Sequence, residues 1–229
     1  MDKTELLRRC FLFAGADARA IDALAARAKV RKFNAGVDLM LEGEGGGVLY
    51  IIESGLVRVW LSEPDNGKQL TLAFLEVGDV VGEIALLDGQ PRTASATAVE
   101  DSVAVAIERK DFFDLVRTVP DFAEHVFELV CERFRQNVAT LNAFAFYDLK
   151  KRLASKLIEL AMSHGRIDGQ RVTFSRRFSQ LELAQLLGVT REAVNRQLSA
   201  WTKHGVVKIN DGRLEILDLA ALKAEHGLG

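Results

Sequence analysis

The chain has 229 residues, 48% of them hydrophobic and 27% charged, with only three prolines. These values are typical of a folded globular protein of one or two domains and argue against a disordered chain. No apolar run approaches the roughly 18 residues of a membrane-spanning helix, and the first ten residues carry no apolar signal-peptide core, so we expect a cytoplasmic protein with no membrane partner. Cys10 and Cys131, far apart in the sequence, do not make a disulfide framework.

The formal net charge of −2 is unevenly distributed along the chain. Residues 148–229 carry 14 Lys and Arg against 9 Asp and Glu, whereas residues 1–147 carry 16 against 23. A polyanionic partner would therefore bind the C-terminal part. The alternative is a chance asymmetry of surface charge.

The first half of the chain changes from helical to β-rich patterns near residue 30. Two short helices are predicted over residues 4–9 and 17–28, with Asp17 as the N-cap of the second. Five β-rich runs then alternate with turn signals: Val48–Ile52, Leu56–Leu61, Leu70–Phe74, Ala94–Ala98 and Val103–Ile107. Asn66-Gly67 between two of these runs is typical of a hairpin turn. Many short strands with frequent turns predict a sandwich or barrel.

A short helix over residues 109–118 is followed by a long helix that Pro120 begins and that continues to about Tyr147. Its apolar residues recur at alternating spacings of three and four: Phe127, Val130, Phe134, Leu141 and Phe144. Asn137 occupies the position of the series between Phe134 and Leu141. Such a repeat predicts a coiled-coil seam. Because one barrel has no need of so long a seam, we expect a second copy of the chain to cover it. Flanking residues such as Val126 can instead pack on the chain's own barrel.

The remaining residues alternate helix and strand signals. The predicted order is a helix at 149–163, a loop marked by Gly165 and Gly169, a strand at Val172–Phe174, helices at 179–187 and 190–203, strands at Val206–Ile209 and Arg213–Leu217 about Asn210-Asp211-Gly212, and a short final helix. This order predicts a helix-turn-helix followed by a β-hairpin wing.

Residues 179–196, SQLELAQLLGVTREAVNR, carry the most specific motif of the chain. Ser179 and Glu182 form a capping box that begins the first helix. Gly188 can adopt the left-handed conformation that a tight turn requires, and Thr190 caps the second helix. Ala184 is small where the two helices must cross closely. These local signals agree on a helix-turn-helix.

The second helix of the motif separates polar from apolar side chains at about 100° per residue. Val194, Leu198 and Trp201 share an apolar face. The opposite face carries Arg191, Glu192, Asn195 and Arg196. Arginine can bind guanine O6 and N7, and glutamate can accept from cytosine N4, so this face suits the major groove of double-stranded DNA. Ser179, Gln180 and Thr190, at the two helix starts, are further candidate DNA contacts. The alternative is a solvated charged helix.

With these features in view, nearly the whole chain resembles the family of the cyclic-AMP receptor protein and the fumarate-nitrate regulator. Residues 81–94, VGEIALLDGQPRTA, look like that family's phosphate-binding cassette. The resemblance implies an α+β fold with a cyclic-nucleotide-binding-like jelly-roll β-barrel at 1–119, a dimerisation helix at 120–147 and a winged helix-turn-helix at 148–229. It implies a homodimeric transcription regulator, not an enzyme, and no catalytic or metal-site motif contradicts this.

The cassette contains the groups that a cyclic phosphodiester needs. Arg92 can bind the phosphate bidentately, and Thr93 supplies a hydroxyl. Glu83 can accept from a ribose 2′-hydroxyl. Gly82 permits close approach, while the backbone N–H groups of Ile84 and Ala85 begin a short helix. The alternative is that Glu83 and Arg92 form a structural ion pair in a barrel without a ligand.

The resemblance further implies that residues midway along the long helix touch the base, which places Asn137 and Val138 there. The family's best-known member has two hydroxyl residues at this point, so the identity of the base stays open, with cyclic AMP favoured and cyclic GMP second. Asn137 can donate to and accept from adenine or guanine, or it sets the register of the coiled coil; both roles can coexist.

By the same resemblance, Arg191, Glu192 and Arg196 match the family's base-contacting positions, which implies a TGTGA-like half-site repeated as a palindrome. RNA polymerase is a further expected partner, contacted in related activators by the loop at 163–170. The main alternatives are the same regulator responding to a non-nucleotide effector or to none. A haem or iron–sulfur sensor is disfavoured, because no histidine lies within residues 30–107 and two cysteines cannot ligate a cluster.

Overall fold

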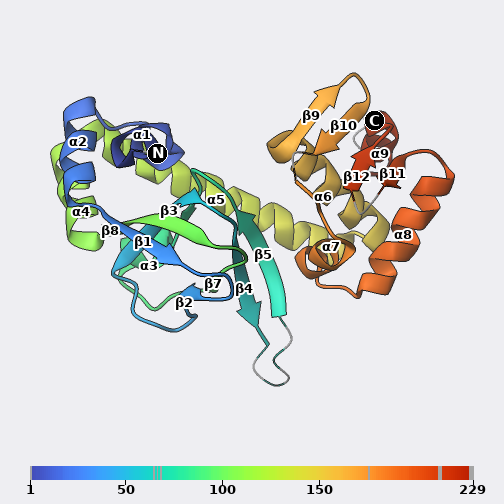
Figure 1. The fold of residues 1–229 in the computed structure, drawn as a ribbon, viewed down its shortest axis with the longest axis horizontal. Helices are drawn as coiled ribbons and strands as arrows, with labels where there is room; N and C mark the ends of the chain where they lie inside the picture. The colour runs from blue at the N-terminus through green and yellow to red at the C-terminus, as the bar shows by residue number, and fades with distance from the viewer. Residues whose placement is uncertain are drawn as a thin grey trace. The chain divides into compact units, whose positions relative to one another are not determined.

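The computed structural model describes residues 2–63, 65, 67, 69–174, 176–210 and 213–226, without the His226 side chain. Asn66, Asp211 and Gly212, on which the two predicted hairpin turns depend, lie outside the described residues. The chain forms two compact units, residues 1–135 and 136–229, that divide within helix α5 (Pro120–Phe146). Figure 1 labels the elements of both units, and each unit is described by itself.

The first unit contains two four-stranded antiparallel sheets with helices against one of them. One sheet has the order β1 (Lys29–Phe33), β8 (Ser102–Glu108), β3 (Val48–Ser54) and β6 (Val80–Val81). The other has the order β2 (Asp38–Met40), β7 (Ser95–Ala98), β4 (Val57–Ser62) and β5 (Gln69–Leu75). The helical elements are α1 (Lys3–Arg9), η1 (Phe11–Phe13), α2 (Ala18–Arg27), α3 (Glu83–Asp88) and α4 (Arg109–Thr118). This two-sheet arrangement confirms the predicted jelly roll, and all five predicted strands are present.

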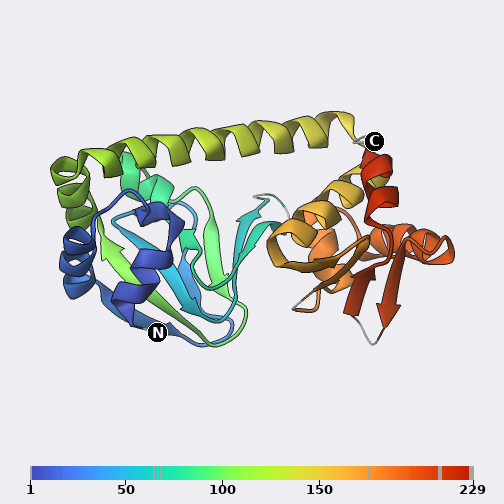
Figure 2. The same ribbon diagram turned by 90° about the horizontal axis from the view of Figure 1, so that it is seen from above.

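The first sheet is covered on both faces, which explains the nearly continuous apolar runs of its central strands. On one face, Leu49 and Ile51 of β3 pack in a core with α1, α2, α4 and the start of α5. On the other, Ile52 and Ala104 pack against residues of the second sheet. Figure 2 shows the N-terminal helices and α4 beside the strands. The sequence analysis did not identify β1, β2 or β6.

Helix α5 belongs to two environments. Phe122 and Val126 are buried in the core of the first unit, as the alternative for Val126 anticipated. The predicted seam residues that follow are exposed in the single chain, with Phe127 72% and Phe134 68% accessible. Among the helices that the structure describes, none is both long and apolar enough to cross a membrane.

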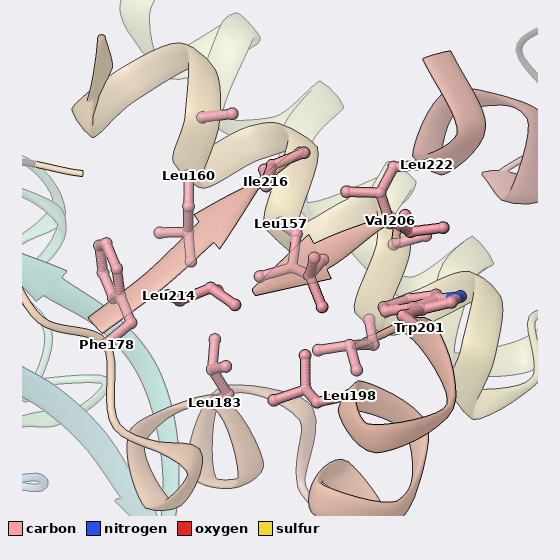
Figure 3. Packing of buried hydrophobic residues seen from close by; sticks show 14 of the residues in the cluster. Leu157, Leu160, Phe178, Leu183, Leu198, Trp201, Val206, Leu214, Ile216 and Leu222 are labelled. Atoms are coloured by element: carbon pink, nitrogen blue, oxygen red, sulfur yellow. The ribbon is translucent and has the colours of Figure 1, made fainter. Parts of the chain in front are cut away.

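The second unit packs four helices of the predicted domain, α6 to α9, with a four-stranded sheet. After the last turns of α5 come α6 (Leu149–His164), β9 (Gly165–Asp168), β10 (Arg171–Phe174), α7 (Gln180–Leu187), α8 (Arg191–Lys203), β11 (Val207–Asn210), β12 (Arg213–Ile216) and α9 (Leu219–His226). The sheet order is β11-β12-β10-β9. Figure 3 shows the core, in which Leu157 of α6, Leu198 and Trp201 of α8 and Ile216 of β12 converge.

The predicted loop about Gly165 and Gly169 is wrong. Residues Gly165–Asp168 form β9, which pairs with β10 in an antiparallel hairpin. Only Gly169 has the left-handed conformation of the turn, with φ of 59°. The glycine at 165 is instead explained by packing, since a Cβ there would lie 2.5 Å from Val172 Cγ1 and 2.4 Å from the Ala161 carbonyl oxygen.

Candidate functional sites

The predicted cassette is built where β6 turns into α3. Gly82 is the N-cap of α3 and has φ of 89°, a conformation that side-chain-bearing residues rarely adopt. A Cβ at this position would lie 2.4 Å from Arg92 Nη1 and 2.9 Å from Met40 Cε. The glycine therefore allows both the turn and the close passage of the arginine side chain. The predicted close approach of a nucleotide to Gly82 stays a prediction.

Arg92 is the most deeply buried charged side chain of the cassette, with 6% of its surface exposed. Its Nη1 donates to the Gly82 carbonyl oxygen at 2.8 Å, and its Nη2 donates to the Val48 carbonyl oxygen at 2.5 Å. Burial lowers the pKa of the guanidinium from its usual value, against the attraction of Tyr50, Glu44 and Glu83. Because a guanidinium has five N–H donors, two carbonyl bonds leave it able to bind an anion as well.

The Glu83 carboxylate is paired with Arg133 rather than with Arg92, so the direct Glu83–Arg92 ion pair of the alternative is not formed, although the charge of Glu83 still attracts the Arg92 guanidinium. Its Oε1 lies 3.5 Å from Nη1 of Arg133, on α5, and Arg133 is 55% exposed while Glu83 is 17% exposed. The sequence analysis did not identify Arg133. In the sequence, Arg133 is marked only by its position next to the seam residue Phe134, and this position does not indicate which strand or helix the Arg133 side chain contacts.

The other cassette residues lie close by in the same unit. Ala85 is buried within α3, whereas Ile84 is 45% exposed. Thr93 is exposed and precedes β7. Asn137 is exposed on α5 but belongs to the second unit, so its contact with a ligand stays a prediction. Within the described part of the chain, no three His, Cys, Asp or Glu side chains gather to hold a metal ion.

In the second unit, the predicted caps form as expected. Ser179 Oγ accepts from the Glu182 N–H at 3.1 Å, and Glu182 Oε2 accepts from the Ser179 N–H at 2.6 Å. Gly188 is left-handed at φ 63° and ends α7. Thr190 Oγ1 accepts from the Ala193 N–H at 3.3 Å and begins α8. These bonds confirm the predicted capping box and turn.

The amphipathic division of α8 is also confirmed. Val194, Leu198 and Trp201 are 3% exposed or less and pack in the core of the second unit. Figure 3 labels Leu198 and Trp201 in this core. The polar candidates of this helix are all exposed: Arg191, Glu192, Asn195 and Arg196. Gln180 of α7 lies with Arg191, Glu192 and Asn195 around a shallow hollow of about 150 Å³. The two helices thus present one continuous polar surface.

One contact on this surface was not predicted. Gln180 Nε2 donates to Asn195 Oδ1 at 3.0 Å and so joins α7 to α8 by their side chains. The sequence carried no signal for this contact beyond the presence of two amides. A second such contact is the ion pair of Arg176 with Glu182 at 2.9 Å, which ties the segment before α7 to the capping box.

Comparisons with known proteins match both parts of the chain to known families. Residues 30–119 match the cyclic nucleotide-binding domain family, and residues 151–225 match the Crp-like helix-turn-helix domain family. The chain is 31% identical over 214 residues to the CRP-like cAMP-activated global transcriptional regulator of Mycobacterium tuberculosis, covering 93% of this chain and 95% of the relative. The chain belongs to the CRP/FNR family of transcription regulators. This confirms the resemblance, the fold class and the prediction of a DNA-binding regulator.

Further similarities extend over most of this CRP/FNR-family chain. It is 33% identical over 212 residues to the cyclic AMP receptor protein of Thermus thermophilus, covering 93% of this chain and 94% of the relative. Among solved structures, a CooA mutant from Carboxydothermus hydrogenoformans is similar with a TM-score of 0.73 and 25% identity, covering 87% of this chain and 88% of that one. The relatives with curated names are regulators rather than enzymes, as expected.

Proposed function

We propose that this chain is a homodimeric transcription regulator of the cytoplasm whose DNA binding is controlled by a cyclic nucleotide, with cyclic AMP favoured over cyclic GMP. The observation that carries the proposal is the buried Arg92 guanidinium beside Gly82 and the start of α3. The two similar proteins named above are described as cAMP-activated or as a cyclic AMP receptor, which supports the same effector. The proposed domains are residues 1–119 for sensing, 120–147 for dimerisation and 148–229 for DNA binding.

In the proposed complex, different residues of the cassette bind different parts of the nucleotide. Arg92 and Thr93 bind the phosphate together with the N–H groups of Ile84 and Ala85, and Glu83 accepts from the ribose 2′-hydroxyl. Asn137 either contacts the base or sets the register of the helix pair. Charge-assisted hydrogen bonds are worth about 1.5–3 kcal/mol each, so Arg92 supplies the largest part of the affinity.

Isothermal titration of the full-length protein with cyclic AMP, and separately with cyclic GMP, tests this effector. We expect binding that Arg92→Ala abolishes and that Arg117→Ala, a change of an exposed arginine on α4, leaves intact. Heat from neither nucleotide with a folded protein would instead favour a non-nucleotide effector or a regulator without one. Retained nucleotide-stimulated DNA binding in Arg92→Ala would refute the role of the cassette.

The proposed dimer interface is the exposed seam of α5. Its apolar members are each at least 43% exposed in the single chain: Phe127, Val130, Phe134, Leu141 and Phe144. Regularly spaced aromatic and aliphatic side chains on one helix face need a partner surface to leave water. A second copy of the chain supplies the matching heptad. Sedimentation velocity measures the resulting mass directly.

The proposed DNA target is a TGTGA-like palindrome read by Arg191, Glu192 and Arg196, with Ser179 and Thr190 near phosphates. Arg196→Ala is expected to cost about 1–3 kcal/mol on the specific site and to relax one base position. Equal loss on unrelated sequences would make Arg196 a phosphate contact instead. For RNA polymerase, the proposed contact is the segment at 163–170, most of which is the β9 strand and turn.

We propose that the nucleotide acts by shifting a population of conformations. Helix α5 ends at Phe146 and α6 begins at Leu149, so the junction between the helices is two residues, Tyr147 and Asp148. Asp148 caps α6 by accepting from the Lys151 N–H at 2.8 Å. A change at this junction would alter the spacing of the two recognition helices in the dimer. Such a shift is limited by the nucleotide's difference in affinity for the two states.

A further inference from the structure

Two side-chain amides meet at the centre of the candidate DNA-reading surface. Gln180 is the first residue of α7, directly after its N-cap, and Asn195 lies on the exposed face of α8. Gln180 Nε2 donates to Asn195 Oδ1 at 3.0 Å, and both side chains line the hollow that Arg191 and Glu192 complete. The base-reading helix is thus connected, through one amide, to the helix that precedes it.

This hydrogen bond determines which chemical group Asn195 offers to DNA. An asparagine side chain has an oxygen that only accepts and an NH2 group that only donates. When Gln180 holds the Asn195 oxygen, the NH2 group is left for a base in the groove. In the major groove, guanine offers N7 and O6 as acceptors and thymine offers O4, adenine offers the N7 acceptor beside the N6 donor, and cytosine offers only the N4 donor.

We infer that Gln180 is a positioning residue that sets the polarity of Asn195, so that Asn195 selects a base edge carrying an acceptor. The inference rests on the proposed DNA-reading role of α8 and goes beyond it by assigning a fourth specificity position and its chemistry. It also predicts an unusual dependence: base preference at this position is controlled by a side chain on the neighbouring helix.

The contact has little importance for folding. Both residues are exposed or partly exposed, and α7 and α8 are already held together by Leu183, Val194 and Leu198 in the core. A hydrogen bond between solvent-accessible neutral amides contributes little net stability, because water replaces it on unfolding. The effect of losing it is therefore expected in base selection rather than in thermal stability.

The test uses the full-length protein with a randomised pool of duplex DNA, in the presence of cyclic AMP, of cyclic GMP, and of neither. The enriched site is then resynthesised with every single base-pair substitution, and a dissociation constant is measured for each. Asn195→Ala should remove the preference at one base pair, and Gln180→Ala should reduce the preference at the same pair by about two- to tenfold, the equivalent of one neutral hydrogen bond. The double variant should lose no more than Asn195→Ala alone.

Gln180→Glu provides the decisive comparison. A carboxylate only accepts, so it must take a hydrogen from the Asn195 NH2 group and leave the Asn195 oxygen for the base. The preference at this pair should then move toward cytosine, whose N4 is a donor with no acceptor beside it in the major groove. Its added negative charge weakens binding to all sequences alike, so ratios between sites isolate the polarity effect. Gln197→Ala is the matched control, because it removes an amide about 200° around α8 from Asn195.

Four outcomes would overturn the inference. Equal losses on all sequences for Gln180→Ala would make Gln180 a phosphate contact, and an acceptor preference that survives Gln180→Glu would show that Gln180 does not set the polarity. If the wild-type protein enriches a site but the Gln180 and Asn195 variants affect different base pairs, the inference is refuted and the proposed function is not. A wild-type protein that enriches no sequence under any condition would refute the proposed function and the inference with it. Circular dichroism melting confirms that each variant is folded.

Discussion

Replacing Arg133 by alanine tests whether α5 supports the nucleotide site through Glu83. The charged atoms of the two side chains lie 3.5 Å apart, and Arg133 is 55% exposed. Two unit charges at this distance attract by about 1.2 kcal/mol in bulk water. For a pair so accessible, side-chain ordering and salt reduce the net contribution to about 0.2–1 kcal/mol. We therefore expect Arg133→Ala to lower the free energy of unfolding by less than about 1 kcal/mol.

The effect on nucleotide affinity is expected to be larger than the effect on stability. In the proposed complex, Glu83 binds the ribose, and a charged hydrogen bond of this kind is worth about 1.5–3 kcal/mol. Without Arg133 the carboxylate must be ordered by the nucleotide itself, which we expect to cost about half of that value. The dissociation constant for cyclic AMP should rise about three- to tenfold. Isothermal titration at fixed salt measures this change.

Arg135→Ala is the control, since it removes the same charge two residues further along α5, about 200° around the helix from Arg133. If both variants bind the nucleotide equally weakly, the effect arises from net charge and not from the contact with Glu83. If Arg133→Ala binds within twofold of the wild type, Arg133 does not orient Glu83. Either result would refute the reasoning.

Three further predictions concern the seam, the cassette and the thiols. Phe134 is 68% exposed in the single chain, and burying that fraction of an aromatic side chain of about 200 Å² is worth at most about 3.5 kcal/mol per chain. Phe134→Ala should therefore shift the sedimentation coefficient toward that of a monomer. An unchanged dimer would exclude Phe134 from the interface. In Gly82→Ala, the alanine must adopt φ near 89° and its Cβ must displace Arg92 Nη1. We expect urea unfolding to give a free energy of unfolding about 1–3 kcal/mol lower, and isothermal titration to show no heat of nucleotide binding. Wild-type values in both measurements would contradict this prediction. Cys10 is 2% exposed, and burial raises the pKa of its thiol to about 11, whereas Cys131 is exposed. A thiol reagent at pH 8 should therefore label one thiol per native chain, that of Cys131, and both thiols in denaturant. Because the folded pKa of Cys10 lies above the unfolded value, its contribution to stability is complete below about pH 9 and is lost toward pH 11. Cys10→Ala should remove that part of the alkaline destabilisation, and equal pH profiles would contradict the assignment.

The elements that the sequence predicted well are those determined by local interactions. The capping box of Ser179 and Glu182 and the turn at Gly188 each involve residues within a few positions of one another. Their geometry therefore follows from short sequence patterns. The helix at 109–118 and the long helix from Pro120 were likewise predicted to within a residue, because apolar periodicity and a proline at the first turn are local signals.

The missed strands depend on partners distant in the sequence. In β1, four of five residues are exposed, so no alternation of apolar and polar side chains marks it. It becomes a strand because β8, some 70 residues later, pairs with it from Lys29 to Phe33. In β9, three of four residues are exposed, and two glycines suggested a loop. An edge strand with a solvated surface carries little hydrophobic signal, and its hydrogen bonds come from its neighbour.

The same distinction divides the candidate sites. Gly82 and Arg92 could be predicted because a compact motif and the chemistry of a phosphodiester both pointed to them. The contacts that hold the cassette side chains could not be predicted. Arg92 is held by Val48, which lies 44 residues away in the sequence, and Glu83 of α3 is held by Arg133 of α5. Contacts of this kind depend on the tertiary arrangement of whole elements, which residue spacing does not encode.

The environment of Arg92 supports the proposed role of this residue in anion binding. Burying a guanidinium costs free energy, as the lowered pKa of Arg92 reflects, and a structural role would require a carboxylate to offset that cost. The charges of Glu44 and Glu83 attract Arg92 and offset part of that cost, but Glu83 is paired with Arg133, and the hydrogen bonds of Arg92 go to two uncharged carbonyl oxygens. An apolar side chain would fill the same volume at lower cost. In the proposed complex, an anion bound next to the start of α3 would offset the rest of this cost, and it would do so only in the bound state.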